Sequence, residues 1–137
     1  MNHLILCIAL ATSASARAEP ASQLGAHVLS LHQRGGYQAA TMGLYLRAPG
    51  GATLGLLRNS LGRSSVYAAH TWQTADRRYA LTAGLVDGYA GGAVSPLLTA
   101  SLRQPIASGL ALRLALIPRP PGKGGSAALH LSVETDF

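Results

Sequence analysis

The sequence predicts an all-β fold, an eight-stranded antiparallel up-and-down transmembrane barrel that follows a cleaved signal peptide. Three observations predict it. From residue 23 onward the apolar residues recur with a period of two and not of 3.6. Turn-forming clusters interrupt this pattern about every ten to fifteen residues, as in an antiparallel meander. The last alternating segment ends on an aromatic residue, Phe137. The 137 residues suffice for one domain and are too few for two.

The first residues have the features of a secretory signal. An apolar run at 4–11 is followed by small residues and by the cleavage pattern Ala16-Arg17-Ala18. We expect cleavage after Ala18, so that residues 1–18 form the signal peptide and residues 19–137 the barrel domain. The alternative is a buried N-terminal helix. Cleavage removes Cys7, the single cysteine of the chain, so no disulfide is expected.

Eight strands are expected in the remaining chain. Their spans are 24–32, 40–48, 52–59, 64–74, 78–88, 94–103, 109–117 and 126–137. Between them, the segments 48–51, 74–77 and 104–108 contain the Pro, Gly and Asp residues that tight turns require. The connections are therefore short.

Alternation assigns the two faces of several strands. In the seventh, four leucines from Leu110 to Leu116 point one way and Arg113 points the other; in the last, His130 and Glu134 share the face opposite the apolar residues. In the fifth strand Tyr79, Leu81, Ala83 and Leu85 oppose Arg78, Ala80, Thr82 and Gly84. We expect an interior polar network that includes Arg78, Thr82, Arg113, His130 and Glu134.

Such alternation fits a membrane barrel with apolar residues outside, and also a soluble periplasmic β-sandwich or a lipocalin-like carrier with apolar residues inside. The expected strands are mostly 8–12 residues long, close to the ~9–11 that cross a bilayer at a tilt. Aromatic residues fall near strand ends, which is typical of membrane interfaces. Tyr45, Trp72, Tyr79 and Phe137 are expected at one interface, and Tyr37 and Tyr89 at the other.

The C-terminal segment resembles the signal of Gram-negative outer-membrane barrels, whose last strand ends in an aromatic residue. The resemblance implies that Phe137 is an assembly signal read by the barrel-assembly machinery and that the protein is exported to the outer membrane. Eight strands then close the sheet around an interior filled by side chains, which excludes a porin role.

The charge points to an anionic surface. After removal of the signal the basic residues outnumber the acidic ones by ten to five, and nearly all are arginine. An exported protein rarely meets nucleic acid, and the charge fits the phosphates of lipopolysaccharide better, so we expect these as the partner and no nucleic acid. With both termini periplasmic, the connections near 33–39, 59–64, 88–94 and 118–125 are external. The residues expected to contact lipid phosphate are Arg34, Arg58, Arg63, Arg119 and Lys123.

One segment stands out, Arg58-Asn59-Ser60-Leu61-Gly62-Arg63-Ser64-Ser65 with Tyr67 after it. It resembles the R-N-S-x-G-R-x-S-x-Y pattern of small barrel-like proteins in proteobacteria and their phages. Asp87-Gly88-Tyr89 stands where that group carries T-G-Y, with Asp in place of Thr, and Pro118 where it carries a strand-ending Pro. The resemblance implies the fold and no particular activity. The simpler interpretation of the segment is a well-capped hairpin.

The expected architecture also resembles that of lipid A palmitoyltransferases and deacylases, small barrels that use Ser and His near the outer leaflet. An acyl-transfer site here requires Ser60 as nucleophile, His32 as general base and Asp87 or Asn59 as the orienting group. The H-x-S-N string of the deacylases is absent. His70, a second candidate base, faces lipid or lies in a bulge.

No cofactor or metal is expected. The five histidines have no metal-ligand spacing and no cysteine partner, and Gly122-Lys123-Gly124-Gly125 lacks the spacing of a phosphate-binding loop. The sequence therefore predicts a structural or surface-interaction role, with a serine-dependent lipid acyl hydrolase or acyltransferase as the alternative.

Overall fold

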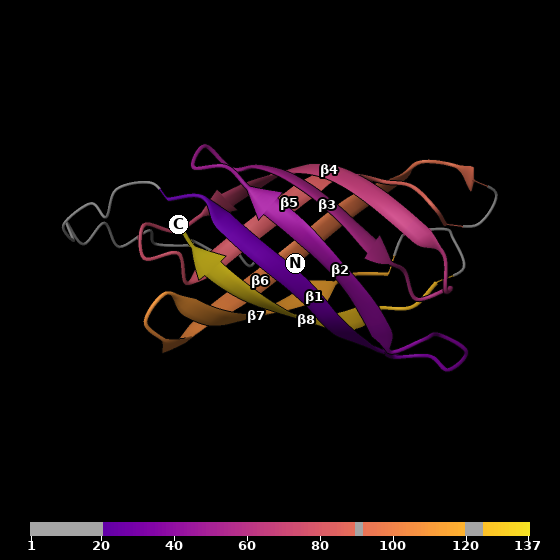
Figure 1. Ribbon diagram of the computed structural model, residues 1–137. Helices are drawn as coiled ribbons and strands as arrows, with labels where there is room; N and C mark the ends of the chain where they lie inside the picture. The colour runs from indigo at the N-terminus through magenta and orange to yellow at the C-terminus, as the bar shows by residue number, and fades with distance from the viewer. Residues whose placement is uncertain (1–20, 90–91, 120–124) are drawn as a thin grey trace, which may run out of the picture.

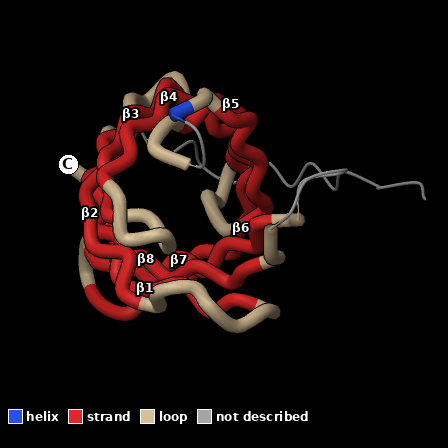
Figure 2. Tube along the Cα trace, turned by 90° about the vertical axis from the view of Figure 1, so that its right-hand side faces the viewer, coloured by secondary structure: helices blue, strands red, loops and turns tan. Residues whose placement is uncertain are grey.

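The computed structural model describes residues 21–89, 92–119 and 125–137, so that the expected signal peptide lies outside the described residues. Each strand pairs antiparallel with the next and β1 pairs with β8, which closes the sheet into a barrel (Figures 1 and 2). This confirms the expected all-β, eight-stranded fold. The strands are β1 (Gln23–His32), β2 (Ala40–Arg47), β3 (Ala52–Arg58), β4 (Ser64–Gln73), β5 (Tyr79–Val86), β6 (Ser95–Ala107), β7 (Leu110–Ile117) and β8 (Ala128–Asp136). In the part of the chain that the structure describes, no helix is long and apolar enough to cross a membrane.

The barrel has two different ends. The terminal end holds the start of β1, the C-terminus and the short turns β2–β3, β4–β5 and β6–β7. The loop end holds residues 33–39, 59–63, 87–89, 92–94, 118–119 and 125–127, and lies opposite in Figure 1. At the terminal end the backbones of Ser22 and Phe137 exchange two hydrogen bonds, of 3.0 and 2.9 Å. The two ends of the sheet are thus joined up to the last residue.

The sixth strand differs from the expectation. We expected it to end at Arg103 and a turn to occupy 104–108, but β6 continues to Ala107. Its pairing with β7 shifts register between Pro105 and Ala107. Because proline has no N–H to donate to the ladder, it is accommodated at such an irregularity. The turn falls instead at Ser108 and at Gly109, whose φ of 70° is in the left-handed region that glycine favours.

The outer face of the sheet is aliphatic and the inner face is polar. Outward side chains that are exposed include Leu24, Met42, Leu44, Leu46, Leu54, Leu56, Val66, Leu81, Leu85, Leu98, Leu102, Leu114, Leu116 and Leu129. Buried inward residues include Gln23, Thr41, Arg47, Thr53, Thr71, Arg103, Arg113, His130, Ser132 and Glu134. A single closed sheet rules out the β-sandwich, which has two packed sheets. The polar interior also differs from the apolar interior that a lipocalin-like carrier requires.

Tyrosine rings lie over glycines inside the barrel. Gly25, Tyr45, Gly55 and Tyr67 pair in register across β1, β2, β3 and β4. A Cβ at Gly25 would lie 2.0 Å from Cζ of Tyr45, and one at Gly55 would lie 2.3 Å from Cε1 of Tyr67. The glycines therefore make the room in which the two rings pack, together with Val86.

This packing corrects part of the expected aromatic arrangement. Tyr45 is buried in the interior, and Tyr89 packs against the same cluster of Tyr45, Tyr67 and Val86. Tyr45 points inward because it is in phase with Thr41 and Arg47 on β2, which nearness to a strand end does not reveal. Tyr89 lies in the connection after β5, beyond the alternation of that strand. Trp72, Tyr79 and Phe137 are exposed at the terminal end, as expected.

Candidate functional site

Glu134 on β8 is the centre of a buried charged cluster. Its side chain is fully buried, and it accepts hydrogen bonds from Arg47 (Nη1, 3.0 Å), Arg103 (Nε, 3.1 Å), Arg113 (Nε, 2.6 Å) and the Tyr45 hydroxyl (2.5 Å). We call these five residues the glutamate cluster. Burying ions is costly unless they are paired and hydrogen-bonded, and here one carboxylate pairs with three guanidinium groups from three other strands. The cluster ties β2, β6, β7 and β8 together across the interior.

Amide and hydroxyl groups continue this cluster toward the terminal end. Oε1 of Gln23 accepts from Arg47 at 2.7 Å and from Gln73 at 2.8 Å, and its Nε2 donates to Asp136 at 2.9 Å. Asp136 also accepts from Nη2 of Arg103 at 2.8 Å. Since each partner comes from a different strand, these bonds fix the stagger of the sheet as well as satisfying buried polar groups.

A second group of interior bonds links two histidines. His27 Nδ1 and His130 Nε2 are 2.6 Å apart, His27 Nε2 lies 3.0 Å from the Tyr67 hydroxyl, and His130 Nδ1 lies 2.7 Å from Oγ of Ser30. We call Ser30, His130, His27 and Tyr67 the histidine chain. Oγ of Ser30 is 3.1 Å from the Thr41 hydroxyl. All its members are held by packing inside the closed sheet.

A bulge in β1 makes the histidine chain possible. Residues 27 and 30 have opposite parity and would face opposite ways in a regular strand. The pairing of β1 with both neighbours shifts between His27 and Leu29, and beyond the shift Ser30 is inward as well. The sequence analysis missed His27 and Ser30 for this reason.

The interior positions predicted from alternation divide as follows. Thr82, Arg113, His130 and Glu134 are buried inside the barrel. Arg78 is a correction: it is exposed in the turn before β5, because that strand begins at Tyr79 and the alternation does not extend to the turn. Arg47 and Arg103 lie in the interior instead. Both alternate in phase with the inward residues of β2 and β6, and this phase could have predicted them from the sequence.

At the loop end, Asn59 organises the β3–β4 turn. Its Oδ1 accepts from the backbone N–H groups of Leu61 (2.9 Å) and Arg63 (3.0 Å), and its Nδ2 donates to Ser65 Oγ and to the Gly88 carbonyl, both at 2.9 Å. The side chain is fully buried. The segment 58–65 is therefore a capped hairpin whose amide also reaches the β5–β6 connection.

The four candidate catalytic residues lie at this end of the barrel. Oδ1 of Asp87 accepts from the Val66 backbone at 2.6 Å. Ser60 is buried, and burial also raises the pKa of the neighbouring Tyr89. His32 stacks on Tyr37 with ring centroids 4.5 Å apart. Among the described residues no hydrogen bond joins Ser60 to His32 or to Asp87, and the hydrogen bonds of Asp87 and Asn59 hold the neighbouring turns together.

The remaining predicted positions are on the surface. Arg34, Arg58, Arg63 and Arg119 are exposed around the loop end, and Lys123 lies outside the described residues. We call these four arginines the basic rim. His70 faces outward on β4 beside Trp72, with ring centroids 4.6 Å apart, and the pairing of β4 with both neighbours is regular there. His70 therefore faces outward from a regular strand and does not lie in a bulge.

We expect Asn59→Ala to lower the free energy of unfolding by about 2 kcal/mol, because it leaves two backbone N–H groups of the β3–β4 turn and the Gly88 carbonyl of the β5–β6 connection without their partner. The measurement is the urea midpoint of the detergent-folded barrel, followed by gel mobility of unheated samples. Ser64→Ala, which removes an exposed hydroxyl from the same hairpin, is the matched control and should leave the midpoint unchanged. Equal midpoints for the two variants would contradict the capping role of Asn59.

Comparison with known proteins adds no family to this description. Neither a protein-family model nor a curated protein matches the sequence. The site is therefore described from its geometry: a closed antiparallel barrel with a polar, charge-paired interior, a capped loop end and an aliphatic outer surface.

Proposed function

We propose that this protein is a transmembrane barrel of a Gram-negative outer membrane, with a structural or surface-interaction role in which the basic rim contacts lipopolysaccharide. The observation that carries this proposal is the reversal of the usual soluble pattern: leucines cover the outside of the closed sheet, and paired charges fill the inside.

The solvent that suits such a surface is hydrocarbon. A soluble monomer rarely exposes a contiguous apolar patch larger than a few hundred Å², whereas aliphatic side chains cover the strands of this barrel on their outer face. Closure supports the same conclusion, because a sheet without edges leaves no backbone donor or acceptor unpaired in lipid.

The terminal end has the side chains that favour an interface. Trp72 is 54% exposed and Tyr79 is 55% exposed, and both lie where their strands meet the β4–β5 turn. Amphipathic rings at this level are typical of the girdles of membrane barrels. Phe137 is also exposed at this end of the barrel.

The loop end has the complementary charge for an anionic partner. The four arginines of the basic rim are exposed, and their planar guanidinium groups match phosphate oxygens in pairs. With the termini in the periplasm, this end faces the leaflet that carries lipopolysaccharide. The proposed contact is with its phosphate groups.

The test is to express the full chain in a Gram-negative host, fractionate the cells and compare gel mobility with and without heating. We expect the protein in the outer-membrane fraction with heat-modifiable mobility. We also expect the double variant Arg58→Gln/Arg63→Gln to fold normally and to bind lipopolysaccharide at least about tenfold more weakly, since it loses two charge-assisted contacts.

Two controls make this test specific. Gln33→Ala changes an exposed, uncharged side chain of the loop end and should bind lipopolysaccharide as the unaltered protein does. A soluble periplasmic protein with unchanged mobility would contradict the membrane location. Unweakened binding by the double arginine variant would contradict the role of the basic rim.

A further inference from the structure

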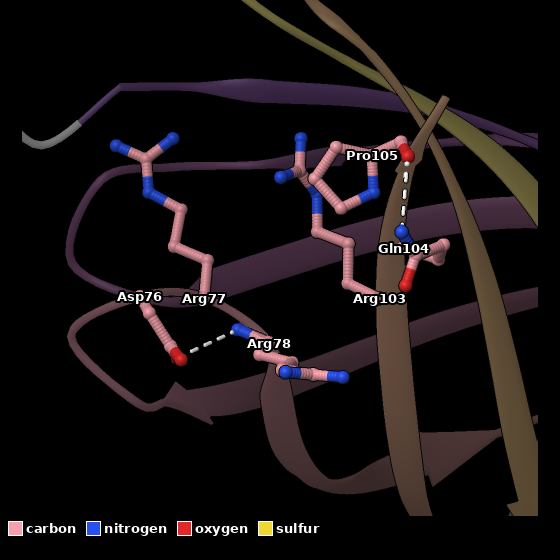
Figure 3. Close-up of a pocket in the computed structure, with 6 residues that line it drawn as sticks. All are labelled: Asp76, Arg77, Arg78, Arg103, Gln104 and Pro105. Atoms are coloured by element: carbon pink, nitrogen blue, oxygen red, sulfur yellow. Dashed lines mark hydrogen bonds between the residues drawn. The ribbon is translucent and has the colours of Figure 1, made fainter. Parts of the chain in front are cut away.

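The terminal end contains a pocket that the proposed contact with lipopolysaccharide does not use. It has a volume of about 240 Å³ and lies between the β4–β5 turn and the end of β6 (Figure 3). Three of the six residues that line it are arginines. The lining consists of Asp76, Arg77, Arg78, Arg103, Gln104 and Pro105.

Two of these arginines are already oriented by carboxylates. Arg103 donates through Nε to Glu134 at 3.1 Å and through Nη2 to Asp136 at 2.8 Å, and Arg77 lies 3.3 Å from Asp136. Among the described residues the Nη1 group of Arg103 has no hydrogen-bond partner. The ion pairs thus hold Arg103 in place and leave one of its donor groups for a further acceptor.

The guanidinium group of the third arginine lies near Asp76, whose pKa it helps to lower, but forms no ion pair with it. The Arg78 side chain is exposed, it forms no salt bridge within the described part of the chain, and its Cζ lies 5.9 Å from the centre of the Tyr79 ring. In Figure 3 it borders the pocket on the side opposite the guanidinium groups of Arg77 and Arg103. Donors therefore reach the pocket from two sides.

The acid that lines the pocket does not neutralise it. Oδ1 of Asp76 accepts from the Thr74 hydroxyl at 2.5 Å and from the Arg78 backbone N–H at 3.0 Å, the bond drawn in Figure 3. The Thr74 hydroxyl and this N–H hold the pKa of the Asp76 carboxyl below its usual value, so it remains ionised. Asp136 and Glu134 pair with Arg77 and Arg103, but Glu134 also pairs with Arg47 and Arg113. Around the pocket and the glutamate cluster, five arginines therefore share three carboxylates, which leaves a net positive charge.

We propose that this pocket binds the phosphate group of a glycerophosphate ester, supplied by the headgroup of an anionic phospholipid. Guanidinium groups bind phosphate through paired N–H donors. The volume is below the ~300–1,000 Å³ of pockets that enclose a drug-sized molecule, so it admits a headgroup and not acyl chains. The neighbouring exposed Tyr79 marks the level of lipid headgroups. The choice of a lipid rests on the proposed function, which places this end at a bilayer surface.

The experiment uses the full chain folded in maltoside micelles, which contain no phosphate, at constant ionic strength set with chloride. Backbone amide shifts of residues 76–78 and of Gln104 are followed by NMR during titration with sn-glycerol 3-phosphate, and separately with phosphatidylglycerol added to the micelles. We expect saturable shifts at these residues. Arg78→Gln should weaken binding about tenfold, Arg78→Lys less, because lysine retains the charge without the paired donors.

Arg119→Gln removes the same charge at the opposite end and should leave these shifts unchanged. Tighter binding of phosphatidylglycerol than of glycerol 3-phosphate identifies the lipid as the source, and the reverse order identifies a free phosphate ester. Absence of saturable shifts in the folded protein, or equal weakening by Arg78→Gln and Arg119→Gln, would overturn the site. A chain that binds glycerol 3-phosphate but never enters an outer membrane would contradict the proposed function and leave the phosphate site standing.

Discussion

Replacing Glu134 with alanine is expected to lower the free energy of unfolding of the barrel by about 3–5 kcal/mol. Glu134 is fully buried and accepts bonds from Arg47, Arg103 and Arg113, so its removal leaves three buried guanidinium groups without their common carboxylate. A domain has only about 5–15 kcal/mol of stability in total. We therefore expect a large loss of the folded, heat-modifiable form in cells as well.

The measurement is the urea midpoint of the purified barrel in micelles, with the matched variant Asp136→Asn beside it. Asp136 carries the same charge on the same strand, but its side chain is 26% exposed, so water compensates part of the loss. We expect its effect to be no more than about 1 kcal/mol. A Glu134→Ala midpoint within the range of Asp136→Asn would show that the glutamate cluster is not what holds the strands together.

The second large effect is expected from Gly84→Ala on β5. A Cβ at this position would lie 2.2 Å from the Ala68 carbonyl oxygen and 2.5 Å from Cα of Ala69. Both atoms belong to the backbone of β4, which cannot turn away as a side chain can, so the two strands must separate or shift. Overpacking of this kind costs about 1–3 kcal/mol.

Gly35→Ala is the control for this substitution. Gly35 lies in the β1–β2 loop with no atom within 4 Å of the position of an added Cβ. The same urea titration should leave its midpoint unchanged. If Gly84→Ala is as stable as Gly35→Ala, then β4 and β5 are not as closely packed as the structure shows.

Alternation predicted the strands and their faces wherever the pattern was long and unbroken. The leucines of β7 point outward and Arg113 points inward, and the polar residues of β8 also point inward. A strand with one polar and one apolar face can be oriented in only one way when the two sides of the sheet differ in polarity. The pattern is local information, and it was sufficient for the number of strands and their faces, whereas the closed sheet was expected from strand length, aromatic positions and the C-terminal segment.

What the sequence did not predict depends on contacts between distant strands. The bulge after His27 reverses the parity of β1, and no local residue type marks it. The Tyr45 ring packs over Gly25 and the Tyr67 ring over Gly55, and these relations between neighbouring strands are not visible in the local pattern. Arg78 was misplaced because a strand boundary, and not its parity, decided its position. At the loop end, the unusual segment 58–65 did indicate a turn, but only the fold reveals that Asn59 reaches Gly88.

The closure of the barrel also has a consequence for the order of assembly. The glutamate cluster takes its carboxylate from β8 and its arginines from strands made earlier, and β8 pairs with β1 across more than a hundred residues of chain. Contacts between segments so far apart form slowly, since the loop entropy must be overcome first. Until β8 arrives, Arg47, Arg103 and Arg113 lack their acid. A chain cut short before β8 therefore carries three arginines in its interior without the carboxylate that pairs with them. Glu134 thus stabilises the finished barrel, and its absence makes an incomplete chain unstable.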